Sequence, residues 1–279
     1  MATWDGAPSP EFPRKTFGQI LRSIWRIGWM LIVTFTLLPF YALARILERI
    51  LPRIGASRAV IWAWARTGVF MCGLRVRSIG TPMPMGGARV ANHSSWADIF
   101  VLLTAAQMYF VAKSEVRSWP FMGWLAAFTG TMFIERKPQA AKRQEAQFLE
   151  RMHTGDRLGF FPEGTSSDGL RVLPFKSTLF AAFMAPAMRE EMWVQPMSVI
   201  YAPRADLRRD FYGWWGSAEF GAHLIDVAAR ATNGVATVVF HPPVRPCDFP
   251  DRKALARHCE AEVAKGHREF ATQDQATAP

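Results

Sequence analysis

The stretch "VANHSSWADIF" (Val90–Phe100) joins an apolar run to a helical pattern, and it decides how the rest of the chain is interpreted. It places His93 and Asp98 five positions apart. On one continuous helix that spacing turns the two side chains well apart, so they would not meet. If a strand ends near Val90 and a helix begins one or two residues after His93, Asp98 lies in the first helical turn and can reach back to the ring. The stretch therefore predicts a strand, a turn and a helix, in that order.

A histidine held by a carboxylate in such a turn is suited to move protons. The carboxylate fixes the tautomer at one ring nitrogen and stabilises the imidazolium, which leaves the other nitrogen to accept a proton. The alternative is structural. Ser95 and Asp98 have the spacing of a capping-box-like helix start, in which case His93 is a bystander. The stretch taken by itself leaves both interpretations open.

The composition favours a protein that works at a lipid surface. The 279 residues are enough to bury a sizeable core, half of them are hydrophobic, and eleven are tryptophan. The net charge of +10 and pI of about 10.1 suit polyanions such as nucleic acid, anionic lipid headgroups or acidic substrates. Tryptophan favours the lipid interface, and no recognised nucleic-acid module carries the basic residues. The three cysteines form no C-x-x-C pair, which argues against a disulfide framework or a zinc site and fits a reducing compartment.

The N-terminal region predicts a membrane-associated helical pair. Residues 1–16 hold several prolines and are expected to be a flexible tail. The run from Ile27 to Ala44 has 18 residues without a charge, interrupted by Pro39, which is the lower edge for a spanning helix. A second apolar run, Ala59 to Leu74, follows at once, and arginines flank the first run on both sides. We expect residues 17–72 to dip into one leaflet with both ends on the cytoplasmic side; one spanning helix plus a core helix is the alternative.

From Leu74 onward, short β-rich runs alternate with helical stretches. This pattern predicts an α/β domain over residues 73–270, with a mixed, largely parallel sheet flanked by helices, and a polar tail over 271–279. The helical stretches are "SSWADIFVLLTAA", "SWPFMGWLAAFT" and "KPQAAKRQEAQFLERMH". The predicted strands are "LRVRSI", "GARVAN", "MYFVAK", "GTMFIER", "RLGFFPEG", "WVQPMSVIY" and "ATVVFHPPV".

Two further groups follow predicted strands and could share a site with His93. Arg136 ends "GTMFIER", and Glu163, Gly164 and Thr165 follow another strand in a turn that can point backbone N–H groups at an anion. In an open α/β sheet the strand ends converge on one ligand crevice. A general base, a cation and an anion-binding turn at strand ends therefore predict one site. Taken singly, Arg136 could equally form a surface salt bridge, and "EGTSSDG" could be an ordinary turn.

Four ordered motifs make the sequence similar to the 1-acylglycerol-3-phosphate O-acyltransferase family, the lysophospholipid acyltransferases. The family shows Asn-His, four residues and Asp; then Gly-x-x-Phe-Ile-x-Arg; then Phe-Pro-Glu-Gly-Thr; and last a proline after a strand. The segments "FVAKSE" and "LPFKS" also resemble family segments, which makes Lys113 and Lys176 candidate contacts. The resemblance covers residues 70 to 201. The matching residues are Asn92, His93 and Asp98; Gly130, Phe133, Ile134 and Arg136; Phe161, Pro162, Glu163, Gly164 and Thr165; and Val194 and Pro196.

One departure from the family pattern concerns the acceptor. The third motif commonly continues Thr-Arg-Ser, whereas here Thr165 is followed by Ser166, Ser167 and Asp168. A cation is missing and an anion is added, so we expect a less positive pocket that suits a zwitterion. The segments "EGTSSDG", "VQPMSVIY" and "YGWWGSAEFGAHL" look most like the lyso-ornithine lipid acyltransferase branch, whose acceptor carries an amine and a carboxylate in place of a phosphate.

The resemblance implies acyl transfer from a thioester of acyl-carrier protein or coenzyme A to a lysolipid hydroxyl. His93 would be the base and Asp98 its orienting partner, while Arg136, Glu163 and the turn after it would hold the headgroup. It also implies an inner-membrane enzyme with its catalytic domain on the cytoplasmic side, facing an anionic membrane surface. It implies no metal or other cofactor. The acceptor would be lyso-ornithine lipid, and 1-acyl-sn-glycerol-3-phosphate is the alternative.

Two other classes were weighed against this one. A lipid hydrolase with a Ser-His-Asp triad would carry a G-x-S-x-G elbow, and the nearest approach, "GTSSDG", is one residue too long. A non-catalytic membrane-binding protein would have no need of both His93 and Asp98.

Overall fold

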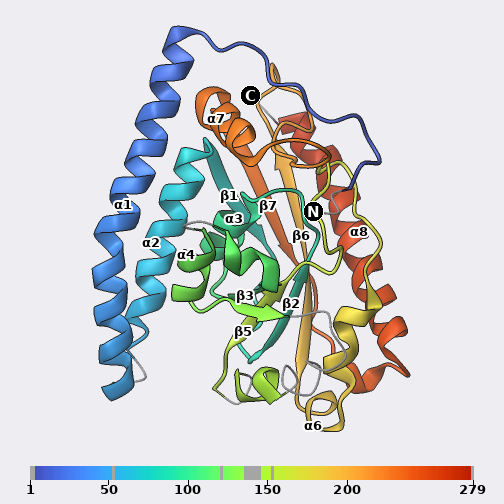
Figure 1. The fold of residues 1–279 in the computed structure, drawn as a ribbon. Coiled ribbons are helices and arrows are strands. Elements are labelled where there is room, and N and C mark those ends of the chain that lie inside the picture. The colour runs from blue at the N-terminus through green and yellow to red at the C-terminus, as the bar shows by residue number, and fades with distance from the viewer. Residues whose placement is uncertain (1–3, 52–53, 120–121, 135–145, 152–153, 278–279) are drawn as a thin grey trace.

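A seven-stranded sheet forms the centre of the molecule. The computed structural model describes residues 4–51, 54–119, 122–134, 146–151 and 154–277. The strand order is β1-β7-β6-β2-β5-β3-β4 (Figure 1). β6 and β7 pair antiparallel, and the other neighbouring pairs are parallel. The strands are β1 (Leu74–Ile79), β2 (Gly87–Ala91), β3 (Tyr109–Lys113), β4 (Met132–Ile134), β5 (Arg157–Phe160), β6 (Trp193–Ala202) and β7 (Gly234–Phe240).

The sheet confirms the predicted fold class, because each strand overlaps one of the seven predicted runs and the sheet is mixed and largely parallel. Helices cover both faces. The helices are α1 (Phe17–Ile50), α2 (Ala56–Met71), α3 (Asp98–Ala105), α4 (Met122–Phe128), α6 (Pro186–Arg189), α7 (Phe220–Arg230) and α8 (Arg252–Thr277), with 3-10 turns at Ser114–Ser118, Ser177–Met184 and Pro246–Asp248.

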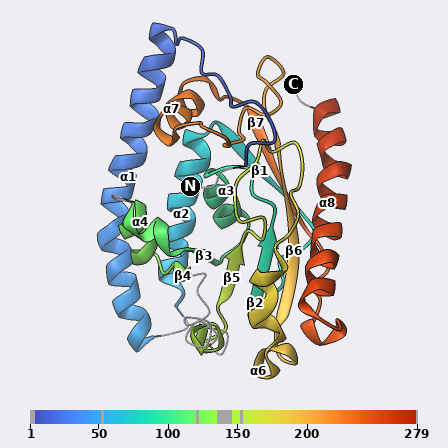
Figure 2. The same ribbon diagram turned by 45° about the vertical axis from the view of Figure 1, so that its right-hand side comes forward.

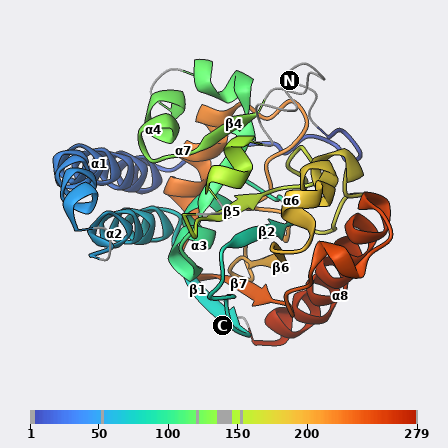
Figure 3. The same ribbon diagram turned by 90° about the horizontal axis from the view of Figure 1, so that it is seen from below.

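Two hydrophobic cores lie on opposite faces of the sheet. Figures 2 and 3 show α8 on one side of β6 and β7, and α2 and α3 on the other. Successive strand residues point to opposite faces, so β6 sends Met197 and Val199 into the core under α2 and α3 and sends Val194 into the core under α8. Burial on both faces explains why the parallel strands are nearly continuous apolar runs in the sequence.

The N-terminal helical pair packs along one flank of the domain (Figure 1). Thr16 and Gln19 form a capping box at the start of α1, and the helix continues through Pro39 although the sequence suggested an interruption there. Arg26 Nη1 donates to the Ala228 and Ala231 carbonyls, 3.1 and 2.7 Å away, at the C-terminal end of α7. A cation at that end of a helix satisfies free carbonyls and complements the helix dipole. α1 is thereby fixed to the α/β domain.

The outward side of α1 is apolar and exposed. Within the described residues, α1 is the one helix that is long and apolar enough to cross a membrane, judged by length and composition alone. Many of its large side chains remain strongly exposed. The residues of α1 with strongly exposed apolar side chains include Phe17, Ile24, Trp25, Ile32, Phe35, Phe40, Leu43, Ile46 and Ile50.

Both chain ends differ from what we expected. The described part of the N-terminal segment, residues 4–16, was expected to be a flexible tail, but it is coil that lies against the domain. Its contacts include hydrogen bonds from Trp215 Nε1 to the Ala7 and Pro8 carbonyls, at 3.3 and 3.2 Å. Lys15 forms an ion pair with Asp226 at 3.1 Å. At the other end, α8 runs to Thr277 and so includes most of the segment that we assigned to a polar tail.

Candidate active site

The carboxyl ends of five mutually parallel strands form one edge of the sheet, and the predicted site residues follow these ends. His93 comes two residues after β2, Lys113 ends β3, and Glu163 follows β5. Strand ends at such an edge converge on a common crevice. The topology therefore places His93, Lys113 and the turn at Glu163 at the same edge of the sheet, and their sharing of one site stays a prediction. Arg136, which follows β4, lies outside the described residues.

His93 and Asp98 form a direct pair. The Nδ1 atom of His93 lies 2.7 Å from Asp98 Oδ2. The same oxygen accepts hydrogen bonds from the backbone N–H groups of Ser94, at 2.8 Å, and Ser95, at 3.0 Å. α3 begins at Asp98, later than expected, so residues 94–97 fold as a turn. Asp98 thus binds the histidine and caps the turn at once, and the two interpretations of this stretch do not exclude one another.

The His93 ring is fixed in orientation but not enclosed. It stacks on Phe161 with the ring centroids 4.0 Å apart and the planes 12° from parallel. Its backbone carbonyl accepts a hydrogen bond from the Ser167 N–H at 3.0 Å. About a fifth of the side chain is exposed, and Nε2 has no hydrogen-bond partner among the described residues. With Nδ1 donating to the carboxylate, Nε2 is the nitrogen that can accept a proton.

Two buried residues that the residue patterns did not single out for a role support the pair. The Tyr201 hydroxyl, on β6, donates to Asp98 Oδ1 at 2.6 Å. Asn92 bridges to Val199 on β6: its Nδ2 donates to the Val199 carbonyl at 2.8 Å, and its Oδ1 accepts from the Val199 N–H at 2.7 Å. Asn92 was recognised as a motif member, and the structure shows that it ties the turn after β2 to β6. The Tyr201 contact joins residues 103 positions apart, and no spacing rule would have found it.

Glu163 is buried beneath the turn that it begins. Its Oε1 accepts a hydrogen bond from the Leu173 N–H at 3.2 Å, and Oε2 has no partner among the described residues. Burial raises the pKa of Glu163 well above its usual value, although the backbone N–H groups of Leu173 and His93 act in the opposite direction. Gly164 has a φ of +71°, a left-handed conformation that favours glycine. In this arrangement the Glu163 carboxyl braces the turn, and a contact with a headgroup stays a prediction.

Thr165 and Ser166 already have hydrogen-bond partners, and Lys176 lies beside the turn that begins at Glu163. The Thr165 hydroxyl accepts a hydrogen bond from the Trp4 N–H at 3.2 Å. Ser166 is buried, and its hydroxyl donates to the Trp214 carbonyl at 2.5 Å. Lys176 is exposed, but its backbone N–H donates to the Pro162 carbonyl at 3.0 Å, which places it beside this turn.

Asp168 does not make the turn less positive in the way we expected. Its carboxylate pairs with Arg171 at 2.9 Å and accepts a hydrogen bond from the Leu170 N–H at 3.0 Å. The cation three residues further along therefore offsets the added anion. The sequence does not show which way a charged side chain points, and in the fold Asp168 and Arg171 pair with each other.

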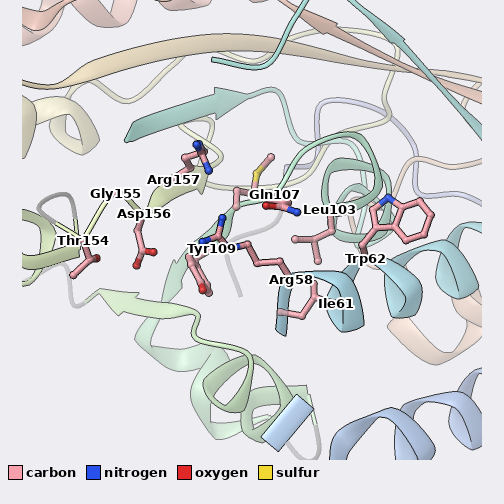
Figure 4. Close-up of a pocket in the computed structure, with 11 residues that line it drawn as sticks. Arg58, Ile61, Trp62, Leu103, Gln107, Tyr109, Thr154, Gly155, Asp156 and Arg157 are labelled. Atoms are coloured by element: carbon pink, nitrogen blue, oxygen red, sulfur yellow. The ribbon is translucent and has the colours of Figure 1, made fainter. Parts of the chain in front are cut away.

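A separate cavity lies at the opposite edge of the sheet (Figure 4). Arg157 and Tyr109 begin β5 and β3, so this cavity is at the amino ends of strands whose carboxyl ends carry the candidate site. Arg58 reaches into it from α2. None of the candidate site residues that the structure describes lines it.

Comparisons with known proteins agree with this geometry. The profile of the family described as Acyltransferase matches residues 86–200, which include the His93–Asp98 pair and the turn at Glu163. A lyso-ornithine lipid O-acyltransferase of Rhodobacter capsulatus is 46% identical over 269 residues, covering 94% of this chain and 96% of the relative. The chain belongs to the acyltransferase family. The resemblance found in the sequence motifs is thereby confirmed, and so is the enzyme class.

Two more members of the acyltransferase family bear on the fold and the branch. A lyso-ornithine lipid O-acyltransferase of Brucella abortus is 35% identical over 252 residues, covering 85% of this chain and 90% of the relative. The crystal structure of the 1-acyl-sn-glycerophosphate acyltransferase PlsC of Thermotoga maritima is similar in fold, with a TM-score of 0.64. It covers 90% of this chain and 97% of that one at 21% identity, so it confirms the acyltransferase architecture.

Proposed function

We propose that this acyltransferase moves a fatty acyl group from a thioester to the hydroxyl of a lysolipid, with His93 as the general base and Asp98 as its orienting partner. The observation that carries the proposal is the 2.7 Å contact between His93 Nδ1 and Asp98 Oδ2, which leaves Nε2 available at the carboxyl edge of the sheet. The motif signal and the family membership support the same assignment.

The pair can carry out the reaction without a covalent acyl-enzyme. Nε2 of His93 takes the proton of the acceptor hydroxyl as its oxygen attacks the thioester carbonyl carbon. The tetrahedral intermediate then collapses, the carbon–sulfur bond breaks, and the departing sulfur receives the proton from Nε2. Asp98 keeps the ring oriented and stabilises the imidazolium that exists between the two proton transfers.

The acceptor that we propose is lyso-ornithine lipid, with 1-acyl-sn-glycerol-3-phosphate as the alternative. The names of the relatives from Rhodobacter and Brucella, which align over most of their lengths, support lyso-ornithine lipid. The absence of a cation directly after Thr165 gives weaker support, since Arg171 offsets the charge of Asp168. Arg136, Lys113, Lys176 and the turn at Glu163, Gly164 and Thr165 are the proposed headgroup contacts.

We also propose that the enzyme sits on the cytoplasmic face of the inner membrane through α1 and α2. The exposed apolar side of α1 would enter the anionic leaflet. Arg26 attaches α1 to α7, which favours a helix that lies in one leaflet beside the domain over a helix that separates from the domain to cross the membrane. The donor would be an acyl thioester of acyl-carrier protein or coenzyme A.

A single reconstituted system tests these points. Purified enzyme in vesicles that contain anionic lipid should acylate lyso-ornithine lipid from either acyl thioester, with an equal or lower rate on 1-acyl-sn-glycerol-3-phosphate. His93→Ala in the same vesicles gives the background. Flotation of the vesicles should carry the enzyme with them, and a Trp25→Ser, Phe35→Ser double variant should float less, because both side chains are more than half exposed on α1.

Acylation of 1-acyl-sn-glycerol-3-phosphate with none of lyso-ornithine lipid would refute the acceptor and leave acyl transfer standing. Transfer to neither acceptor would refute the function. The ratio of the rates on the two acceptors is measured on the wild-type chain. Ser166→Arg would restore the commoner family residue, but it would place an arginine at a buried position whose side chain is hydrogen-bonded to the Trp214 carbonyl.

A further inference from the structure

The second oxygen of the Asp98 carboxylate has a dedicated donor. Oδ2 receives His93 Nδ1 and two backbone N–H groups, whereas the hydrogen bond to Oδ1 comes from the hydroxyl of Tyr201 at 2.6 Å. Asp98 is completely buried, and Tyr201 lies near the carboxyl end of β6 on the opposite side of the carboxylate from the histidine. A hydrogen bond from a neutral donor to a buried carboxylate is among the stronger kinds in proteins.

Tyr201 is itself held in place from behind. Its ring stacks on Tyr212, with the centroids 5.3 Å apart and an angle of 28° between the planes. The Tyr212 hydroxyl donates to the Cys72 carbonyl at 3.2 Å, which ties the stacked rings to the loop after α2. The Tyr201 hydroxyl therefore has a fixed position, and the direction of its hydrogen bond fixes the plane of the Asp98 carboxylate.

Few titratable groups lie against this arrangement. Burial raises the pKa of Tyr201 well above its usual value, and the Asp98 charge raises it further, so the hydroxyl keeps its proton and always donates. Burial also raises the pKa of Tyr212 and Cys72, which face Tyr201 from the other side, while the charge of Arg26 on α1 acts against this rise in both groups. Glu163, from the loop after β5, is the other acid near Asp98, and its pKa is raised as well.

We infer that Tyr201 is a positioning residue of this acyltransferase, which holds Asp98 so that Oδ2 meets His93. The inference rests on the proposed function of the His93–Asp98 pair and extends it to a third member. A carboxylate that loses its Oδ1 donor holds the proton of the imidazolium more strongly. In a variant without that donor, a smaller share of the His93 rings would be in the neutral form that can accept the proton of the acceptor hydroxyl.

The test compares Tyr201→Phe with Tyr212→Phe in the vesicle assay. Each variant removes one hydroxyl from the same buried pair of rings and keeps the stacking, but only the first removes a donor to Asp98. We expect Tyr201→Phe to lower kcat/KM by about tenfold near neutral pH, the effect of one hydrogen bond to a charged group, and to move the acidic limb of the pH profile upward. Tyr212→Phe should lower thermal stability without moving that limb. Glu163 is common to all three proteins, so its titration cancels in the comparison.

A second measurement separates positioning from a merely structural role. If Tyr201 acts through Asp98, Tyr201→Phe should have little further effect on kcat/KM in an Asp98→Asn background, because coupled residues are not additive. Should Tyr201→Phe fold poorly, 3-fluorotyrosine at position 201 keeps the shape and makes a stronger donor, and it should move the acidic limb downward.

Two outcomes would overturn the inference. One is a folded Tyr201→Phe enzyme whose pH profile is unshifted, and the other is a decrease in kcat/KM by the same factor in the Asp98→Asn background as in the wild type. Failure of the proposed function itself would look different: either the wild type would transfer acyl groups to neither acceptor, or His93→Ala would retain activity, whatever residue 201 is.

Discussion

Among the described residues, His93 and His241 each lie near an acid and a hydroxyl. They differ in whether a ring nitrogen is left free to accept a proton. His93 gives Nδ1 to Asp98 at 2.7 Å and keeps Nε2 without a partner among the described residues. His241 has Nε2 bonded to Ser198 Oγ at 2.8 Å and Nδ1 facing Glu262 Oε2 at 3.7 Å. By residue types alone, the second group looks more like a hydrolase triad than the first.

The arrangement around His241 is a packing joint between β6 and α8. Ser198 is completely buried and donates its proton to the Val263 carbonyl at 2.8 Å, so its oxygen is not poised to attack a substrate. The backbone of α8 closes over the pair, since a Cβ on Gly266 would lie 2.7 Å from Ser198 Oγ and 2.6 Å from His241 Cε1. The comparison teaches that an unoccupied, reachable ring nitrogen distinguishes the candidate catalytic histidine, and the presence of an acid and a hydroxyl does not.

The largest expected difference between the two histidines follows from removing each ring in turn. His93→Ala should lower acyl transfer by about 10²- to 10⁴-fold, the usual worth of general base catalysis, with little change in thermal stability. His241→Ala should lower thermal stability and leave the turnover of the folded enzyme close to wild type, because it removes a buried hydrogen bond far from the acceptor. Turnover per folded molecule and melting temperature are the two measurements. Equal activity losses in both variants would contradict the distinction.

Replacing the acid beside each histidine gives a second pair of variants that tests the same difference. Asp98→Asn should cost on the order of 10²-fold in kcat/KM, since the amide cannot stabilise the imidazolium as the carboxylate does. Glu262→Gln should leave both activity and stability nearly unchanged, because a partly exposed pair at 3.7 Å contributes little. If Asp98 were only a helix cap, its replacement would instead remove about 1 kcal/mol of stability with activity retained.

The smallest expected effect concerns another buried histidine, His223. Burial lowers its pKa from 6.5 to about 4, and its Nδ1 accepts a hydrogen bond from Trp96 Nε1 at 2.8 Å. Between these two pH values the unfolded chain binds the proton and the folded chain does not, so the free energy of unfolding falls as the pH falls through this window. The loss attributable to His223 is at most about 3.5 kcal/mol, at about 1.4 kcal/mol per pKa unit.

Chemical denaturation of wild type and His223→Gln between pH 7 and pH 4 measures this loss. The glutamine oxygen can still accept from Trp96, and the variant should show a shallower fall in the free energy of unfolding. Glu163, whose raised pKa acts with the opposite sign, is common to both proteins and cancels in the difference. Parallel curves for the two proteins would show that His223 does not titrate in this way.

The sequence was informative where the signal is local. The alternation of short apolar runs predicted seven strands, and the five-residue spacing of His93 and Asp98 predicted a pair across a turn, which the 2.7 Å contact confirms. Such features depend on residues that are neighbours along the chain, so the pattern contains the physics that forms them. The start of α3 was less well placed, because Asp98 caps the turn itself and residues 94–97 stay outside the helix.

What could not be predicted depends on contacts between distant segments. β7 inserts between β1 and β6 and runs antiparallel to β6, and no local pattern specifies a strand neighbour. Tyr201 reaches Asp98 only because β6 lies beside β2. The direction of a short side chain is equally hidden: Ser166 was read as part of a ligand-facing turn, but it bonds to Trp214. The segment before α1 was expected to be free because it contains several prolines and a glycine, yet Trp215 of a distant loop holds it.

The arginines that fasten α1 to α7 impose an order of events on biosynthesis. Arg26 and its acceptors at Ala228 and Ala231 are 202 and 205 residues apart in the chain, and Arg22 bonds to Ala229 across 207. A ribosome adds roughly 5–20 residues per second, so Arg22 and Arg26 are synthesised about 10–40 s before the carbonyls that receive their guanidinium groups. For that interval the longest apolar helix of the enzyme is a nascent segment without its docking partner. α1 is therefore available to bind a lipid surface early in translation, and its docking against α7 is one of the last steps of folding.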